Sequence, residues 1–174
     1  MSGDLSTFPI EPIQEFVDAN SFPDFGSSSF PLFALGPVSY SVLKDISATI
    51  NEQSRAELGF SPKEYDELGP AIDIPEKWDL NDKSLNDAVH HHFSLFNPYE
   101  KLPTGDPKWY PVGFVAVLKK DWRGKGLLLT YLQKEDGYLA LKSCVVKTDE
   151  LGGQLVSFRQ GDAEFDYARG FIEA

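Results

Sequence analysis

The spacing of hydrophobic positions changes near Trp109, and this change predicts the class of the fold. Before it, apolar residues recur every three or four positions, which is typical of one buried side of a helix. After it, they alternate with polar residues or form short apolar runs, which is typical of strands. The sequence therefore predicts an α+β protein. A helical and irregular N-terminal half is expected to pack on a C-terminal antiparallel β-meander of about four strands, with a short C-terminal helix.

Three helices are expected within residues 38–97. The first begins at Ser39, and Gly59 stands where a left-handed C-terminal cap belongs. The second follows residues 61–64 (SPKE), a capping box with proline at the first helical position. The third runs from about Ser84 to Phe96 and ends before Asn97-Pro98. Its inner face carries Leu85, Val89, His92, Phe93 and Phe96.

Residues 1–37 are rich in proline, phenylalanine and serine, and they predict an irregular segment that wraps over the core. A short helix is expected from Pro12 to Ala19, because proline is tolerated in a first helical turn. A tail in solvent would gain nothing from large apolar rings, so these rings are expected to be buried. Phe16 belongs to the expected short helix, and the phenylalanines of the irregular chain are Phe8, Phe22, Phe25, Phe30 and Phe33.

The meander is expected within residues 108–160. Asp136-Gly137 is a hairpin signal, and Gly152-Gly153 predicts a turn into the last strand. Asp162 can cap a helix over residues 162–173, in which Phe165, Ala168 and Ile172 align. The four predicted strands are Val112–Leu118, Leu127–Leu132, Tyr138–Val146 and Gln154–Arg159.

The length of 174 residues favours a single domain spanning residues 1–174, because it suffices for one well-buried core and is short for two. The longest apolar runs fall far below the roughly 20 residues that cross a bilayer. No lysine or arginine precedes Lys44, so no basic leader is visible. The single cysteine, Cys144, cannot form an internal disulfide. We therefore expect a cytoplasmic protein without a membrane partner.

Charge is distributed unevenly along the chain. The formal net charge is −11; residues 1–100 carry 17 acids and 5 bases, whereas residues 101–174 carry 10 acids and 11 bases. The negative electrostatic field of an acidic protein repels nucleic-acid backbones and attracts basic partners. The alternative interpretation is that the acidity only keeps a small domain soluble.

A run of three histidines, His90-His91-His92, is the most conspicuous polar feature. Consecutive helical residues point about 100° apart, so the three cannot bind one metal ion together. Asp87 with His91, or with His90, has usable spacing, but no Cys or His outside the run supplies a further ligand. We therefore expect no metal site. His92 lies on the core side, and it is also the best available acid–base group.

The loop after the strand at residues 113–117 has the sequence Trp122-Arg123-Gly124-Lys125-Gly126. This resembles the cofactor motif of the GNAT acetyltransferases: Arg123 and Gly126 match it, and Leu128 stands in place of the closing small residue. The candidate cofactor-binding residues are Arg123, Gly124 and Gly126. The resemblance implies that the loop amides would hold the pyrophosphate of acetyl-CoA at a helix N-terminus. The alternative is a polar hairpin loop with glycines at turn positions. No cofactor is predicted.

Aromatic residues gather in the loops that flank the predicted sheet. Tryptophan, tyrosine and arginine are the preferred anchors of protein interfaces. Alternatively, these rings seal the edges of the sheet. The candidate partner-binding residues are Tyr99, Trp109, Tyr110, Trp122 and Arg123.

The leading functional hypothesis is a non-enzymatic acidic protein that binds or regulates a protein partner, as an inhibitor or immunity-type protein does. Acidic groups would steer a basic partner and an aromatic ring would anchor it. The alternative is a small enzyme or ligand carrier with a pocket between helices and sheet. Phe93, Phe96 and Tyr110 would line that pocket with His92 open to it, and acetyltransferase-like activity is one case. A purely structural subunit is a third alternative.

Overall fold

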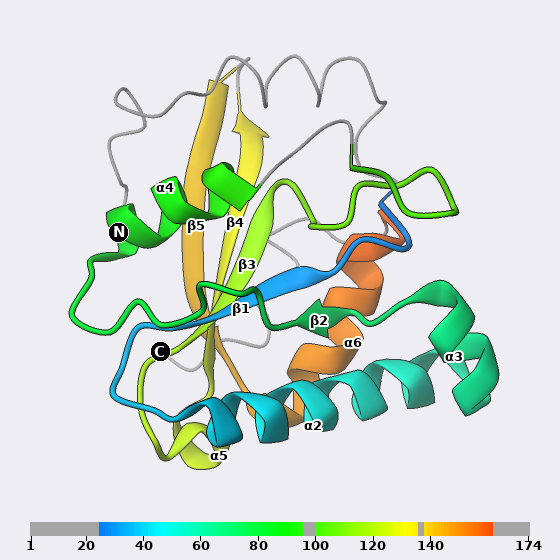
Figure 1. The fold of residues 1–174 in the computed structure, drawn as a ribbon, viewed down its shortest axis with the longest axis horizontal. Helices are drawn as coiled ribbons and strands as arrows, with labels where there is room; N and C mark the ends of the chain where they lie inside the picture. The colour runs from blue at the N-terminus through cyan, green and yellow to red at the C-terminus, as the bar shows by residue number, and fades with distance from the viewer. Residues whose placement is uncertain (1–24, 96–99, 136–137, 162–174) are drawn as a thin grey trace.

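The computed structural model describes residues 25–95, 100–135 and 138–161, which form a mixed five-stranded sheet with helices on both faces (Figure 1). The strand order is β2-β1-β3-β4-β5. Strand β1 is parallel to β2 and β3, whereas β3, β4 and β5 are antiparallel. The α+β class is confirmed, and the antiparallel part has three strands. The bounds are β1 Phe30–Ala34, β2 Ile72–Asp73, β3 Gly113–Val117, β4 Leu127–Glu135 and β5 Tyr138–Val146.

Strands β1 and β3 form the centre of the sheet. Leu32 pairs with Val115 and Phe33 with Ala116, and every residue of both strands is buried. The apolar run of β3 was predicted. Strand β1 was not, because residues 30–34 were expected to be irregular. Pro31 obscures the strand pattern. Its nitrogen lies on the side of β1 that faces β3, and the register of these two strands begins only at Leu32, so its missing N–H is tolerated there.

Helices α2 (Tyr40–Leu58), α3 (Pro62–Leu68) and α4 (Leu85–Leu95) confirm the three predicted helices. Ser39 accepts a hydrogen bond from the Val42 amide at the start of α2, and Gly59 ends it with φ +67°. Ser61 and Glu64 form the expected capping box. These ends were predictable because each depends on a local side chain or a glycine.

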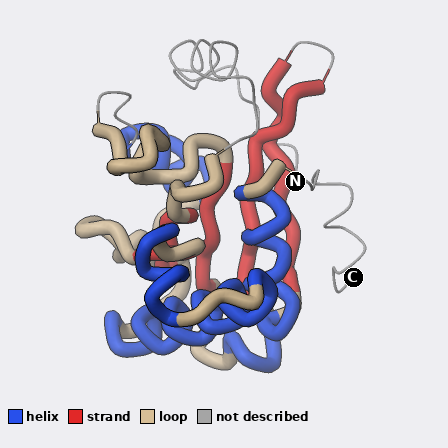
Figure 2. Tube along the Cα trace, turned by 90° about the vertical axis from the view of Figure 1, so that its right-hand side faces the viewer, coloured by secondary structure: helices blue, strands red, loops and turns tan. Residues whose placement is uncertain are grey.

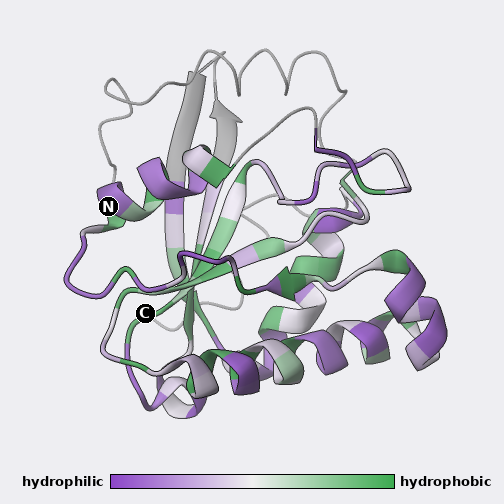
Figure 3. Ribbon diagram, in the orientation of Figure 1, coloured by the Kyte–Doolittle hydropathy of each residue, from purple (hydrophilic) through white to green (hydrophobic). Residues whose placement is uncertain are grey.

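The sheet lies between two helical layers (Figure 2). On one face, α4 places His92 5.4 Å from Phe114, measured between ring centroids. On the other face lie α2 and α6 (Thr148–Arg159), where Phe158 is 6.3 Å from Phe30. Hydrophobic residues concentrate on the central strands and hydrophilic residues on the outer sides of α2 and α3 (Figure 3).

Helix α6 corrects the prediction of a glycine turn followed by a strand at 154–159. Gly152 and Gly153 lie inside the helix, where Gly152 faces α2. Ser54 Oγ donates a hydrogen bond to the Gly152 carbonyl at 3.0 Å, and the Gly152 amide donates to Gln53 Oε1 at 3.1 Å. A Cβ at Gly152 would collide with Gln53 Cβ and lie 2.9 Å from the Ile50 carbonyl oxygen. Glycine is required because two helices approach closely.

The segment before β1 is held on the core by hydrogen bonds. The Ser27 amide donates to Asp106 Oδ2 at 2.9 Å, and Ser28 Oγ donates to the Pro107 carbonyl at 2.6 Å. Phe25, Phe30 and Phe33 are buried, as expected. The predicted helices at 12–19 and 162–173, the turn at 136–137, and Phe8, Phe16 and Phe22 lie outside the described residues. No described helix is both long and apolar enough to traverse a membrane.

Candidate functional site

Two adjoining hollows of opposite charge lie beside α6. The acidic groove, of about 550 Å³, lies between α2 and α6. The basic hollow, of about 370 Å³, lies between α5 (Trp122–Lys125) and the start of α6. Gln53 and Asp149 line both, so the two hollows adjoin one another at these residues.

Carboxylates from two helices line the acidic groove. Glu57 of α2 and Asp149 of α6 are exposed, and Glu150 is half-buried. Gln154 is 5% exposed, and its Oε1 atom receives no hydrogen bond from a described residue; the same holds for Glu150 Oε2. Buried acceptors without donors are uncommon in folded proteins, because each loses its bonds to water. The groove therefore carries negative charge, and two residues in its wall each hold a buried acceptor atom without a donor among the described residues.

Three cations from two segments line the basic hollow: Arg123 and Lys125 on α5, and Lys147 at the junction of β5 and α6. All three are exposed, and among the described residues none of them forms an ion pair. The Arg123 guanidinium carbon lies 4.1 Å from the centre of the Trp122 ring, a cation–π contact that orients it.

Helix α5 is fixed to the fold at both ends. The buried Trp122 accepts, through its carbonyl, a 2.7 Å hydrogen bond from Thr148 Oγ1 at the start of α6. Gly126 follows with φ +79°, and a Cβ there would lie 2.5 Å from the Val146 carbonyl oxygen. Only glycine fits both that backbone angle and that approach. Arg123, Gly124 and Gly126 thus do lie together at a hollow.

The local structure around these three residues differs from the acetyltransferase pattern that they resemble. Helix α5 has four residues, and strand β4 follows directly at Leu127. The resemblance implies a longer helix at this point, whose N-terminal amides would hold pyrophosphate. That helix is not present, so the arrangement on which the family's cofactor site depends is missing here.

His92 is enclosed in the core and does not line either hollow. Its Nε2 atom lies 3.0 Å from the Pro111 carbonyl oxygen, and its side chain packs on Phe114. Burial lowers the pKa of His92 to about 4, against the opposing effect of the hydrogen bond to Pro111. At neutral pH the ring is therefore uncharged, with its Nε2 proton donated to a carbonyl.

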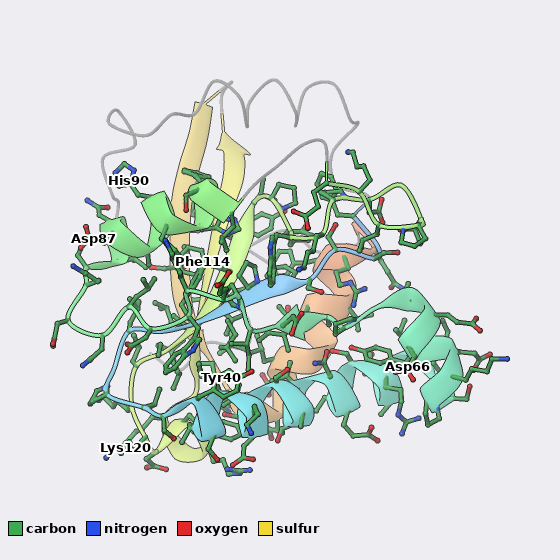
Figure 4. The ribbon with its side chains drawn as sticks, viewed as in Figure 1. Tyr40, Asp66, Asp87, His90, Phe114 and Lys120 are labelled. Carbon is green, nitrogen blue, oxygen red and sulfur yellow. The ribbon has the colours of Figure 1, made fainter. Side chains whose placement is uncertain are left out.

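Asp87 and His91 make contacts within the fold, Asp87 as a cap of α4 and His91 by packing on Phe33. The Asp87 carboxylate accepts hydrogen bonds from the amide and hydroxyl of Ser84, both at 2.8 Å, and these bonds lower its pKa. It caps α4 and points outward, as does His90 (Figure 4). His91 packs edge-on against Phe33 at 5.3 Å between ring centroids. Within the described residues, no three His, Cys, Asp or Glu side chains gather as metal ligands.

The candidate partner-binding aromatic residues are dispersed. Tyr110 and Trp122 are buried in the core, whereas Trp109 is half-buried, with Lys108 Nζ 5.2 Å from its ring centre. Arg123 is exposed, and Tyr99 lies outside the described residues. The sequence did not single out Tyr40, which is 48% exposed and follows the cap of α2. A loop position therefore did not predict exposure.

Comparison with models of protein families, with curated proteins and with solved structures finds no match to this chain. The residues that the sequence did not reveal as a site are Gln53, Glu57, Lys147, Asp149, Glu150 and Gln154. Two of them lie on α2 and three on α6, so all but Lys147 belong to the groove between these helices. Because residues 154–159 were predicted as a strand, this interface had no signal in the sequence.

Proposed function

We propose that this protein binds a basic segment of a protein partner in the acidic groove between α2 and α6. The observation that carries the proposal is the composition of that groove: three carboxylates surround a buried Gln154 whose Oε1 accepts no hydrogen bond from the described residues. A lysine or arginine side chain supplies both the positive charge and the missing donors.

The charge of the whole chain supports the same partner. A net charge of −11 raises the local concentration of a basic segment and speeds its encounter with the groove. The nearby cations Arg55 and Lys63 reach carboxylates outside the groove, namely Glu52 and Glu67. Among the described residues, Glu57, Asp149 and Glu150 form no ion pair and are thus available to a partner.

The compartment and the class of partner form part of the same proposal. We place it in the cytoplasm as a single domain with no nucleic-acid partner. A chain with a single cysteine, Cys144, suits a reducing compartment, and the acidity of the chain disfavours a nucleic-acid backbone. The alternative, an enzyme or carrier with an aromatic pocket, would need His92 open to a cavity, whereas His92 is 3% exposed and bonded to Pro111.

The experiment is titration of the full chain with a fluorescent oligo-arginine peptide at low salt. The matched variants are Glu57→Gln with Glu150→Gln in the groove, and Asp66→Asn with Glu76→Gln outside it. Both pairs remove the same charge. Asp66 lies on α3 at the far end from Lys120 (Figure 4). The groove variant loses two ion pairs with the peptide, so its affinity should fall about tenfold. The affinity of the control variant should fall much less.

Two outcomes would overturn this function. Equal weakening by both variant pairs would show that the peptide responds to total charge and not to the groove. Failure of the unmodified chain to bind the peptide at low salt would remove the basis of the proposal. Unfolding curves of the variants establish that each retains its fold, since all four substituted side chains lie at the surface or at the rim of the groove.

A further inference from the structure

The basic hollow stands out because the protein around it is acidic. Residues 119–125 (KKDWRGK) carry five exposed charges, four of them positive, in a chain with a net charge of −11. Of those five charged residues, Arg123 and Lys125 line the hollow, and Lys147 joins them from the end of β5. Among the described residues, Asp149 is the one carboxylate that lines the hollow with them, so the cations outnumber it three to one and the hollow favours an anion.

We propose that the basic hollow binds the phosphoryl group of a small phosphorylated molecule. Its volume of about 370 Å³ falls within the range of small-molecule sites. Arg123 offers a planar fork of N–H donors, and Lys125 and Lys147 offer point charges, which is the mixture that suits phosphate oxygens.

The hollow is preorganised by contacts that do not involve the cations themselves. The Thr148 hydroxyl ties the start of α6 to the Trp122 carbonyl, and the Trp122 ring orients the Arg123 guanidinium. The Lys125 amide donates to the Asp121 carbonyl at 2.9 Å, which holds the α5 turn closed. A phosphoryl group would therefore bind without ordering a loop first, and this saves conformational entropy.

A substitution at Asp149 should affect the two sites in opposite directions, because Asp149 lines both hollows. Its carboxylate repels an anion in the basic hollow and attracts a cation in the acidic groove. Asp149→Asn should therefore strengthen phosphate binding and weaken binding of the oligo-arginine peptide. A variant that merely misfolds would lose both activities, so opposite changes cannot arise from loss of structure.

The experiment titrates the full chain with inorganic phosphate, with adenosine monophosphate and with adenosine, at constant ionic strength, and follows the amide NMR signals. Lys125→Gln with Lys147→Gln is the site variant. Lys119→Gln with Lys120→Gln is the matched control, because both lysines are exposed, precede α5 closely in the chain and do not line the hollow. Lys120 lies beside α5 (Figure 4). The site variant should weaken phosphate binding about tenfold, and the control less than about threefold.

Comparing the affinities of phosphate, adenosine monophosphate and adenosine shows which part of the ligand the hollow binds. Tighter binding of adenosine monophosphate than of phosphate shows that the hollow also holds the organic part, and equal binding shows that it selects the phosphoryl group alone. Binding of adenosine as tight as that of the nucleotide would overturn the proposal. So would equal weakening by the two lysine pairs, or no phosphate-dependent shift in the signals of Gly124 and Gly126. The peptide titration of the acidic groove is a separate measurement, so either proposal can fail alone.

Discussion

The Nε2 atom of His92 lies 3.0 Å from the carbonyl oxygen of Pro111, which joins α4 to the chain entering β3. The ring is 3% exposed and lies tilted against the rings of Phe114 and Phe93. Its other nitrogen, Nδ1, has no hydrogen-bond partner among the described residues. Protonation would place a positive charge in this apolar layer beside His91, so the folded state favours the neutral ring.

Stability should consequently fall as the pH drops from 6.5 to about 4. The unfolded chain binds a proton on His92 near pH 6.5, whereas the folded chain binds it only near pH 4. The stabilisation is complete above pH 6.5 and is lost toward pH 4, with a loss of about 3 kcal/mol in free energy of unfolding. Urea unfolding at a series of pH values measures it.

His92→Gln is the control for this pH dependence. Glutamine keeps an N–H donor for the Pro111 carbonyl and does not titrate, while His90, His91 and every carboxylate remain. The difference in unfolding free energy between the two proteins should change with pH between 6.5 and 4 and be constant above. Parallel curves through that range would show that His92 is not the group that titrates.

Gly152 and Gly153 should respond oppositely to substitution by alanine. Gly152→Ala inserts a methyl group against the Ile50 carbonyl and Gln53, and overpacking of this kind costs about 1–3 kcal/mol. At Gly153 the nearest atom to an added Cβ is Glu57 Cδ, at 3.7 Å, an ordinary contact. Gly153→Ala should therefore stabilise α6 by about 0.5–1 kcal/mol through helix propensity.

Chemical denaturation of the two alanine variants distinguishes these effects. Because the substitutions are adjacent and chemically identical, any general effect of alanine on the unfolded chain is shared. A gain at both positions would mean that α2 and α6 are further apart than the Ser54–Gly152 hydrogen bond indicates. A loss at both would mean that residue 153 also faces a neighbour.

The same glycine pair shows why part of the fold could not be predicted. Two glycines in succession predict a turn, and only the position of α2, which lies about 100 residues earlier in the sequence, makes them helical. Local signals sufficed for α2 and α3, since Ser39, Gly59 and Ser61 act on their own helix ends. Strand β2 has two residues, too few to show a period.

The candidate site was also predictable only where local sequence determines it. Arg123, Gly124 and Gly126 were singled out from a local motif, and they do line the basic hollow. Their partner Lys147 comes from the far end of β5, which the antiparallel pairing of Leu127 with Val146 brings alongside. Glu57 and Asp149 meet only when α6 packs on α2. Contacts made by distant segments leave no periodic signal, so the acidic groove was not predictable.

Arg159 is a buried arginine at the end of α6. Its Nη2 atom donates to the Gly69 carbonyl at 3.0 Å, while Nε and Nη1 have no partner among the described residues. Burial lowers its pKa, and Tyr65 and Asp106 oppose that effect. A buried charge with two unpaired donors is costly, and an apolar side chain of similar length removes the cost. Arg159→Met should therefore raise the free energy of unfolding by about 1–2 kcal/mol.

The control for Arg159 uses Asp106, a carboxylate that raises the pKa of the guanidinium and accepts a hydrogen bond from the Ser27 amide. If the guanidinium instead stabilises the fold through Asp106, then Arg159→Met and Asp106→Asn will each destabilise the protein, and the double variant will lose less than the two single losses together. Such coupling would reverse the prediction. Stabilisation by Arg159→Met, with an additive double variant, would show that desolvation of the guanidinium outweighs its attraction to Asp106, because the charge is buried with too few acceptors around it.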